Sequence, residues 1–521
     1  MLDLILAASL TAATPAAGQD CQAILGALYE GPDEAELADP VDGRALDSVA
    51  ALVALRAARG DVPIVVMGGN FAQADFRGAR LHNICFLNAD LAGSDWRGVE
   101  AAGMGFVRSD LSGARMTGAR LPRILLRQPV MKDVDASEAD LSEGRLDGGW
   151  DGSLENLRLD RASLRGFRFD CGITIGDGCP LERRISFRGA DLTGASLNTY
   201  RGGGDDDWTG ARIDRTEVGL HQVEEMASAD MIGPLLVRGG DAVVELSAAD
   251  RQVLIARIRP SEEARTPSFD CSRAAAAVER LICGSEGGRL RALDVLVAGL
   301  YRRVSGSSAA PAAAQRAWLR ERNRCAADES AGWSCVQEAY ERRREQLIGR
   351  IGPPDWARAG ATVLFVVPVV DFDDGFRDDP LYRRLLPVIE GGAWSHVAVR
   401  VNADGSLDAR GEAVGANAHT CSLAAERLQL DRSTGWYSTE REPESGDPPA
   451  WRGRPIPILL FWGERGEVYR HGHPEGGGEG VDPRAGDYAS CGVRAGFGEL
   501  VRLPVPEAES RAFFESLDEA P

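Results

Sequence analysis

The sequence lacks an apolar run of the roughly 18 residues that a membrane-spanning helix needs, so we expect no transmembrane span. The longest candidate, Leu4 to Ala17, is shorter, ends in small residues and is followed by polar Gln19 and Asp20. This order is typical of a signal peptide, although Asp3 stands in a region where basic residues are usual. We therefore expect residues 1–18 to be a signal peptide and the protein to be periplasmic or secreted.

Signatures of the common catalytic and cofactor sites are also missing. Only six His are present and no C-x-x-C occurs, which disfavours a zinc site. No G-x-S-x-G, H-E-x-x-H, Walker or dinucleotide-binding pattern is found. We expect no metal, no cofactor and no enzymatic activity. For residues 351–505 alone, the sequence leaves the question of an enzymatic function open.

Two features of that region contain residue types that bind metals. An acidic cluster is formed by Asp371, Asp373, Asp374, Asp378 and Asp379. An EF-hand would need a carboxylate at the position of Tyr382, so the cluster does not fit that calcium loop. His471 and His473 lie in a Gly- and Pro-rich segment, where we expect them to be solvated.

A basic surface for nucleic acid is missing as well. The net charge of the chain is −20, and residues 71–146 hold ten acidic and ten basic side chains. Residues 267–350 carry a net charge of +4 and residues 351–521 carry −11. No basic stripe marks a nucleic-acid-binding face, so we expect no nucleic-acid partner.

Cysteine, in contrast, is present in an even number, ten, which favours paired disulfides and an oxidising compartment. We expect Cys171 and Cys179 to close a loop. We expect Cys421 and Cys491 to join distant strands. The pairing of Cys21 and Cys85 stays open at this stage.

An apolar side chain returns at every fifth position over 76 residues. The sixteen positions are Phe71, Phe76, Leu81, Phe86, Leu91, Trp96, Ala101, Phe106, Leu111, Met116, Leu121, Leu126, Met131, Ala136, Leu141 and Leu146. Most residues two positions earlier are small, as in Ala89, Ser109 and Ala139. Neither a helix nor a strand keeps a five-residue period on one side. We therefore expect a coil that turns a corner at each repeat, with four repeats in a turn of about 20 residues.

The recurring triplets Ala74-Asp75-Phe76 and Ala190-Asp191-Leu192 resemble those of the pentapeptide-repeat family. The resemblance implies a right-handed quadrilateral β-helix, which we assign to residues 71–220. The frame slips by three residues before Leu154, and an insertion follows Phe169. The repeat then returns at Phe187 and closes with Trp208, Ile213 and Val218.

Open coils at the two ends of a β-helix would expose unpaired strand edges, so each end needs a cap. We assign residues 19–70 as a helical N-terminal cap, with an apolar-periodic helix from Leu46 to Ala58. Residues 221–266 are assigned as a second helical cap and linker, with a helix opening at Ser247 to Asp250.

Residues 267–350 are rich in Ala and Arg, have helical periodicity and contain four cysteines. Their ordered strings are 269–271 (FDC), 278–283 (VERLIC), 290–301, 315–319 (QRAWL) and 322–325 (RNRC), with Tyr340 following Cys335. This combination resembles the amino-terminal module of LprI-type lysozyme-inhibitor proteins. The resemblance implies a small helical domain of exported proteins, some of which bind lysozyme.

Four cysteines in this module allow three pairings. We favour Cys271 with Cys283 and Cys325 with Cys335. A straight helix over the eleven intervening residues would hold Cys271 and Cys283 about 16 Å apart, so the helix must be short and start near Ala276.

Three side chains of the module, Arg316, Trp318 and Arg320, are candidates for a protein-binding surface. The alternative for Trp318 and for Tyr301 is ordinary core packing. We expect Arg316, Arg320 and Arg322 to form a solvated face.

After Pro353 the chain becomes β-rich. The apolar runs Ala361–Val370, His396–Val401 and Ile456–Trp462 are separated by turn signals. They predict an antiparallel β domain over residues 351–505, of barrel or sandwich type, with residues 506–521 as a tail.

These features predict an exported, non-enzymatic binding protein of the cell envelope, with the β-helix as scaffold and a protein partner, for which lysozyme is the candidate. The alternative is a structural or adaptor protein without inhibitory activity. A DNA-mimicking inhibitor of DNA gyrase would need a strongly acidic β-helix, which the balanced charge of residues 71–146 does not provide.

Overall fold

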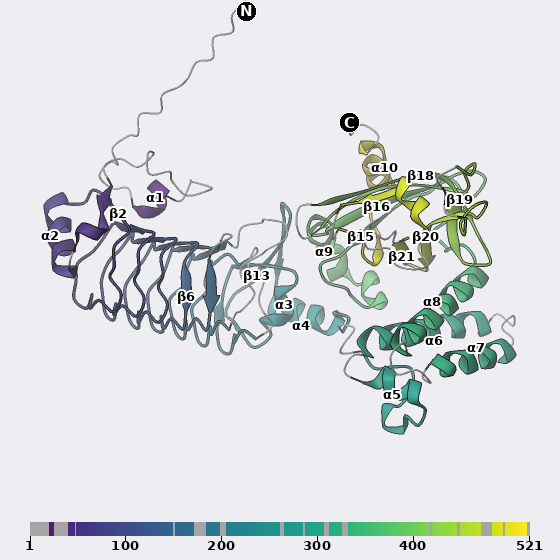
Figure 1. Ribbon diagram of the computed structural model, residues 1–521, viewed down its shortest axis with the longest axis horizontal. Helices are drawn as coiled ribbons and strands as arrows, with labels where there is room; N and C mark the ends of the chain where they lie inside the picture. The colour runs from purple at the N-terminus through teal and green to yellow at the C-terminus, as the bar shows by residue number, and fades with distance from the viewer. Residues whose placement is uncertain are drawn as a thin grey trace, which may run out of the picture. The chain divides into compact units, whose positions relative to one another are not determined.

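The computed structural model describes residues 20–25, 40–46, 48–148, 152–170, 184–197, 205–260, 265–284, 287–306, 312–325, 332–415, 419–444, 447, 449–469, 482–492 and 495–517. The chain forms two compact units, residues 1–256 and residues 257–521 (Figure 1). Within the ranges just given, no helix combines the length and the apolar character needed to cross a membrane. Each unit is described below by itself.

The first unit is a β-helix of stacked parallel strands (Figure 1). Its main sheet consists, in order, of β1 (Val41–Asp42), β2 (Ile64–Met67), β3 (Ile84–Leu87), β4 (Gly105–Val107), β5 (Leu125–Arg127), β7 (Arg145–Asp147) and β9 (Arg168–Asp170). A second face pairs β6 (Val130–Lys132) with β8 (Ser153–Glu155). The expectation of a β-helix is therefore confirmed.

The strand register confirms the length of the coil. Cys85 pairs with Gly105, and Gly105 pairs with Leu125, so consecutive coils are 20 residues apart. The expected three-residue slip is also present, because Arg145 pairs with Arg168. The coil that contains the insertion is longer still, with Arg168 bridged to Ser196. The insertion itself, with Cys171 and Cys179, lies outside the described residues.

All sixteen repeat centres from Phe71 to Leu146 are buried, none with more than 3% of its surface exposed. Aromatic rings stack along the axis, with the centroids of Phe76 and Trp96 3.9 Å apart and those of Phe86 and Phe106 5.6 Å apart. This continuous apolar column is the core of the first unit, since burial of large side chains is the main favourable term in folding.

Two further positions of each repeat shape the corner. In every repeat centred from Phe71 to Leu141, the residue two places after the centre has a positive φ, such as Gly78 (71°) and Asn83 (52°). The residue just before the centre is often Asp or Asn, and its side chain accepts a hydrogen bond from the second amide after it. Asp75 accepts in this way from the Arg77 amide at 3.0 Å. In each repeat, one residue with a left-handed backbone conformation thus turns the chain, and in many repeats a side-chain hydrogen bond stabilises the turn.

The N-terminal cap differs in part from the helical one expected. It contains α1 (Cys21–Leu25) and α2 (Val49–Arg59), the latter capped by the Ser48 side chain. It also contains β1 and β2, and β2 already pairs with β3 in the 20-residue register. The β-helix therefore begins before Phe71, at Ile64.

The second cap is also only partly helical. Its helices are α3 (Gln222–Glu225) and α4 (Ala248–Arg257), and Ser247 and Asp250 cap the start of α4 reciprocally. Its strands are β10 (Arg212–Ile213) with β12 (Asp230–Met231), and β11 (Thr216–Gly219), β13 (Leu235–Gly239) and β14 (Ala242–Leu246). Since β14 runs antiparallel to β13, it ends the parallel stacking.

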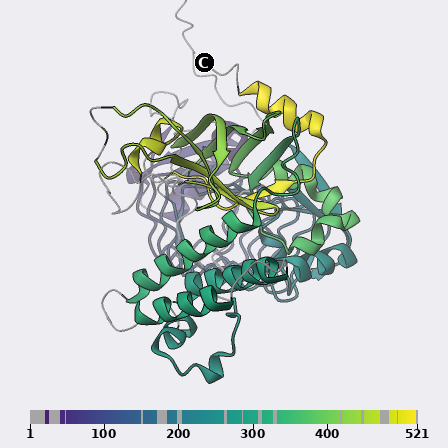
Figure 2. The ribbon, with the colours of Figure 1, turned by 90° about the vertical axis from the view of Figure 1, so that its right-hand side faces the viewer.

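The second unit begins with a helical module and continues into a β domain (Figure 2). The helices of the module are α5 (Ala277–Cys283), α6 (Gly288–Gly306), α7 (Ala312–Arg324) and α8 (Gly332–Ile351). Both favoured disulfides are present, Cys271–Cys283 and Cys325–Cys335. The short helix α5, which starts at Ala277, brings the Cα atoms of Cys271 and Cys283 to 5.8 Å.

The β domain is a closed antiparallel β-barrel. Its strands are β15 (Thr362–Val367), β16 (Ser395–Val401), β17 (Leu407–Val414), β18 (Thr420–Leu430), β19 (Trp436–Thr439), β20 (Ile456–Trp462), β21 (Arg465–Val468), β22 (Ala489–Cys491) and β23 (Leu500–Leu503). Strand β17 pairs with both β16 and β18, which closes the ring and leaves β22 outside it on β18. The expected Cys421–Cys491 disulfide joins β18 to β22.

Two helices pack on the barrel, α9 (Pro380–Gly391) and α10 (Glu507–Ser516). Helix α10 lies in the segment that we expected to be a tail. It packs against β15 and β16, and its Phe514 is buried with the guanidinium groups of Arg400 and Arg410 about 4.5 Å from its ring. The C-terminal segment therefore belongs to the barrel domain up to Ser516.

Candidate functional site

Trp318 lies in the core of the helical module. Its side chain is 8% exposed, its indole N–H donates to the Ala339 carbonyl at 3.0 Å, and its ring meets Tyr340 edge to face. The core-packing alternative for Trp318 is therefore correct. Arg316 and Arg320, on the same helix α7, are exposed.

Arg322 is not part of the solvated face that we expected. It is 6% exposed, and its guanidinium donates to the Tyr340 hydroxyl at 2.7 Å. That hydroxyl donates in turn to Asp294 at 2.7 Å. Burial and the Asp294 carboxylate raise the pKa of Tyr340 well above its usual range. These three side chains form one buried network that joins α6, α7 and α8.

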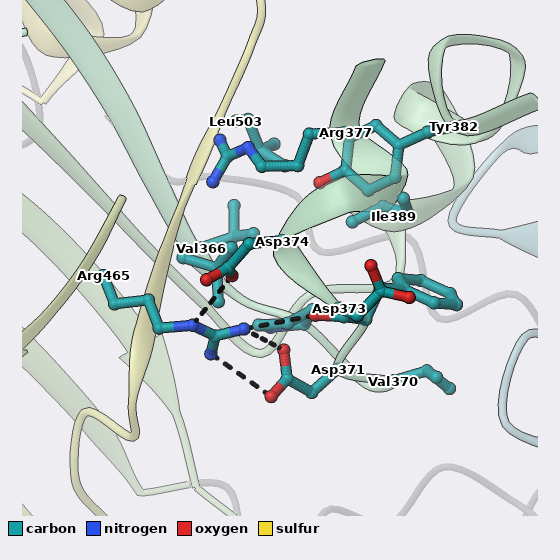
Figure 3. Close-up of a pocket in the computed structure, with 13 residues that line it drawn as sticks. Val366, Val370, Asp371, Asp373, Asp374, Arg377, Tyr382, Ile389, Arg465 and Leu503 are labelled. Carbon is teal, nitrogen blue, oxygen red and sulfur yellow. Dashed lines mark hydrogen bonds and ion pairs between the residues drawn. The ribbon is translucent and has the colours of Figure 1, made fainter. Parts of the chain in front are cut away.

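Two residues of the acidic cluster after β15, Asp371 and Asp374, bind the guanidinium of Arg465, as Figure 3 shows. Arg465 is 5% exposed and donates to Asp371 at 2.7 Å, to Glu499 at 2.7 Å and to Asp374 at 3.3 Å. Burial disfavours the charged guanidinium, but these carboxylates outweigh it, so the pKa of Arg465 is raised. The cavity beside Arg465 has a volume of about 10 Å³, which leaves space for no more than a water molecule.

Two other acidic residues of the cluster, Asp373 and Asp379, also have structural partners. Asp373 pairs with Arg257 at 3.4 Å, and the Asp379 side chain caps the first turn of α9. Among the residues that the structure describes, no group of three His, Cys, Asp or Glu side chains is arranged to hold a metal ion. His471 and His473 lie outside the described residues.

A much larger cleft lies between helix α6 and the barrel. Its volume is about 950 Å³, at the upper end of the range for ligand sites. We call it the arginine cleft, because eight arginines line it: Arg259, Arg265, Arg289, Arg302, Arg303, Arg344, Arg377 and Arg465. Its acidic lining residues are Asp374, Glu464, Glu467 and Glu499.

Every carboxylate of the arginine cleft already has an arginine partner. Arg344 binds Glu467 through two hydrogen bonds, of 2.5 and 3.0 Å. Glu464 accepts from Arg502 at 2.6 Å and also pairs with Arg377 at 3.2 Å. Asp374 and Glu499 both bind Arg465. The acidic groups therefore stabilise the walls and are committed to arginines.

Three arginines at the edge of the cleft differ from the others. Arg265 makes a hydrogen bond to the Pro260 carbonyl at 3.2 Å, and neither it nor Arg302 or Arg303 forms an ion pair with any described residue. Arg302 and Arg303 are exposed. The described lining contains no Ser, Cys, His or Lys. Thr266 supplies the one hydroxyl of the described lining. The guanidinium groups of Arg265, Arg302 and Arg303 can form charge-assisted hydrogen bonds with an anion.

The four disulfides of the described residues occur in every part of the fold. Cys21–Cys85 joins α1 to β3, Cys271–Cys283 and Cys325–Cys335 lie in the module, and Cys421–Cys491 lies on the barrel. Among the described residues no cysteine is free. The Cys21–Cys85 pair was not assigned from the sequence, because its partners come from a terminal segment and a coil 64 residues away.

One column on the outer surface of the β-helix carries charges of alternating sign. It runs from Asp95 through Arg115 and Asp135 to Arg158, one residue from each coil. Asp95 binds Arg115 at 3.2 Å, and Asp135 lies 3.7 Å from Arg158. These ion pairs join neighbouring coils.

The family described as pentapeptide repeats matches residues 84–128 of the chain in eight copies. No curated protein matches the chain. Among solved structures, HetL, a pentapeptide repeat protein involved in heterocyst differentiation regulation from the cyanobacterium Nostoc sp. strain PCC 7120, is 19% identical. The alignment covers 35% of this chain and 90% of HetL, with a TM-score of 0.17.

Two further structures are similar at the same level. QnrB1, a plasmid-mediated fluoroquinolone resistance protein, is 14% identical over 37% of this chain and 84% of its own, with a TM-score of 0.18. Rfr23, a pentapeptide repeat protein from the cyanobacterium Cyanothece 51142, is 18% identical over 29% of this chain and 86% of its own, with a TM-score of 0.12.

Proposed function

We propose that this pentapeptide repeat protein is an exported, non-enzymatic binding protein of the cell envelope. The β-helix serves as a rigid scaffold, and the second unit receives the partner. The observation that carries this proposal is the set of four disulfides, which occur in the β-helix, the helical module and the barrel alike. Disulfides persist in oxidising compartments and are rare in the cytosol.

Cell fractionation combined with non-reducing mass spectrometry tests the export proposal. We expect the protein in the periplasmic or secreted fraction, with a mature chain that starts after Gly18. We expect the peptides that contain Cys21 and Cys85 to be joined. Recovery from the cytosol with reduced thiols would overturn the proposal.

The finer proposal is that the helical module binds and inhibits lysozyme. It is supported by the resemblance of residues 267–350 to LprI-type modules and by the exposed Arg316 and Arg320 on α7. The charge of the module, +4, does not attract a basic enzyme such as lysozyme, so contact must rest on shape or on acidic groups elsewhere in the chain.

A lysis assay tests inhibition. The full-length protein, in excess over lysozyme, should slow the clearing of a cell-wall suspension. The double variant Arg316→Gln with Arg320→Gln should relieve this effect if α7 is the contact. Unchanged lysis with the natural protein would remove the inhibitor proposal and leave the adaptor alternative, for which a pull-down from an envelope fraction would identify the partner.

Enzymatic activity of the barrel is the least supported reading. The acidic groups of the arginine cleft are bound to arginines, and the described lining offers no nucleophile paired with a base. Binding therefore agrees better with this site than catalysis.

A further inference from the structure

We infer that another pocket of the barrel domain binds a neutral saccharide of one or two sugar rings. The pocket lies where the first turns of α10 meet the start of β15 and the end of β23, and its volume is about 390 Å³. This volume falls within the range of small-molecule sites. We call it the hydroxyl pocket, after Thr362 and Ser510 in its lining. The inference depends neither on export nor on lysozyme binding.

The two hydroxyl groups of the pocket have no hydrogen-bond partner in the part of the chain that the structure describes. Thr362 of β15 is 4% exposed, and Ser510 of α10 is 2% exposed. Both belong to the lining of the pocket. A buried hydroxyl without a partner is unfavourable unless water or a ligand supplies the missing hydrogen bond. Both hydroxyls are therefore available to a molecule in the pocket.

The charged side chains of the lining are of both signs. Arg358 and Arg502 are basic, and Asp355, Glu464 and Glu507 are acidic. An anion would meet three carboxylates and a cation would meet two guanidinium groups, so the charge of the lining favours neither. An apolar ligand would leave the polar groups without partners. A neutral ligand that carries many polar groups avoids all three costs.

Several of these charged side chains keep free hydrogen-bonding groups. Arg358 donates through its Nε to the Asp355 carbonyl at 3.2 Å, and neither side chain forms an ion pair with any residue in the described ranges. Arg502 binds Glu464 through its Nε at 2.6 Å, which leaves its two terminal nitrogens for a ligand. The lining thus offers guanidinium donors and a carboxylate acceptor beside the two hydroxyls.

A saccharide matches this mixture of donors and acceptors. A sugar hydroxyl has one donor hydrogen and two acceptor lone pairs, so adjacent hydroxyls can bind a guanidinium and a carboxylate at the same time. Trp356 also lines the pocket, held by a hydrogen bond from its indole N–H to the Gly463 carbonyl at 2.9 Å and by edge-to-face contact with Phe365. Trp356, Ala361 and Val505 supply apolar surface for the C–H groups of a sugar ring.

The walls of the hydroxyl pocket are held by the barrel. Thr362 pairs with Arg400 of β16, and Leu364 of β15 pairs with Leu503 of β23. Helix α10 is anchored on the same strands by Phe514, which is 1% exposed. The binding surface is thus ordered before a ligand arrives, which lowers the entropic cost of binding.

Saturation-transfer difference NMR of the full-length, disulfide-bonded protein tests the inference. The probes are glucose, N-acetylglucosamine, cellobiose and chitobiose. We expect at least one of them to bind saturably at millimolar concentration. Because the probes are neutral, an increase in salt concentration should leave the affinity unchanged within about twofold.

Variants place the binding in the hydroxyl pocket. Thr362→Val with Ser510→Ala removes both hydroxyls and should weaken binding of the probe about tenfold, because two hydrogen bonds to the sugar are lost. The unfolding temperature of the free variant should not fall, because neither hydroxyl is bonded to a described part of the protein.

A second variant keeps the test decisive if the buried substitutions disturb the fold. Arg358→Gln, at an exposed position, should weaken binding about threefold and leave the unfolding temperature unchanged. Unchanged affinity in this variant would contradict the inference.

The matched control is Thr420→Val with Ser516→Ala. It makes the same substitutions at exposed positions of β18 and α10 that lie outside the pocket lining. The affinity for the probe should stay within about twofold of the natural value.

Three further results would overturn the inference. The first is the absence of saturable binding for all four probes. The second is an equal loss of affinity in the pocket variant and in its control. The third is displacement of the bound sugar by millimolar inorganic phosphate, which would assign the pocket to a small anion.

Discussion

The backbone of Gly105 lies directly beneath the side chain of Cys21: a Cβ atom added to Gly105 would stand 2.6 Å from the Cys21 Cβ and 3.0 Å from its sulfur. Gly105 is stacked between Cys85 and Leu125 on consecutive coils, on the outer face that α1 covers. Cys21 and Leu25 of α1 pack there with Val65, Leu87, Val107 and Leu125. The missing side chain at residue 105 therefore makes room for the disulfide and for α1.

Gly105→Ala should loosen α1 from the β-helix. The added methyl group overlaps Cys21, so either the disulfide or the helix must shift, at a cost of about 1–3 kcal/mol in the free energy of unfolding. Thermal or urea unfolding of the full chain measures the change. In a background with both Cys21 and Cys85 replaced by Ser, the same substitution should cost less. An equal cost in both backgrounds would contradict this explanation.

Trp96→Ala should be among the most destabilising single changes in the first unit. Trp96 is fully buried, its ring stacks on Phe76, and its N–H donates to the Ser94 hydroxyl at 2.7 Å. Loss of such a side chain leaves a cavity on the axis and costs about 3–5 kcal/mol. Ile232→Ala is the control, because Ile232 is 59% exposed and its truncation should change stability by less than about 0.5 kcal/mol.

The stability of the β-helix should fall in acid through Asp95. Hydrogen bonds from the Arg97 side chain are the main cause that lowers the pKa of Asp95 to about 2, and Arg115 adds to the shift. A carboxyl whose folded pKa lies below its unfolded value stabilises the fold above the unfolded pKa, near 4, and loses that contribution as the pH falls toward 2. Asp95→Asn should reduce the loss of stability between pH 4 and pH 2.

A neighbouring carboxylate provides the control for this pH experiment. The Asp110 side chain accepts from the Ser112 amide at 2.8 Å and forms no ion pair among the described residues. Asp110→Asn should therefore retain most of the acid sensitivity of the natural protein. Carboxyl chemical shifts followed by NMR would report the pKa of Asp95 directly. A value of 4 or above would contradict the prediction.

Arg465→Met should destabilise the barrel, because it removes the one guanidinium that Asp371, Asp374 and Glu499 share. The cost should be about 1–3 kcal/mol, below that of a fully buried pair, because the three carboxylates are 30–64% exposed and Arg259 also pairs with Asp371 and Asp374. Denaturant unfolding of the second unit measures the loss. Arg383→Met, on the exposed side of α9, is the matched control and should change stability by less than about 0.5 kcal/mol. Similar effects of the two substitutions would contradict the role given to Arg465.

The axis of the β-helix could be predicted from the sequence because its signal is local. A five-residue period suffices to bury Phe106 and Leu111, and the three-residue slip shows in the spacing alone. The corner of each repeat could be predicted as well, because Gly and Asn are frequent two places after the repeat centres. Arg108 and Arg123 have positive φ at that same position, however, so the stacked coils impose the corner even where the residue does not favour it.

The remaining features depend on contacts between distant segments. The helical periodicity of the sequence places Arg322 on the surface. Only the packing of α6 and α8 shows that Arg322 lies in a network with Tyr340 and Asp294. The arginine cleft requires the junction of α8 with the barrel, where Arg344 and Glu467 are 123 positions apart. Helix α10 was missed because a short polar segment gains its stability from burial of Phe514 and not from its own propensity.

Consecutive coils of the first unit differ in length. Coils of 20, 23, 28 and 21 residues follow one another while the buried columns stay aligned. Each change in length falls at the same edge of the β-helix, after residues 147, 170 and 197, and the described turns keep their partners on both sides. Such an edge is a natural place to splice a reporter or an epitope, and homologous chains should vary there in length without matching changes elsewhere.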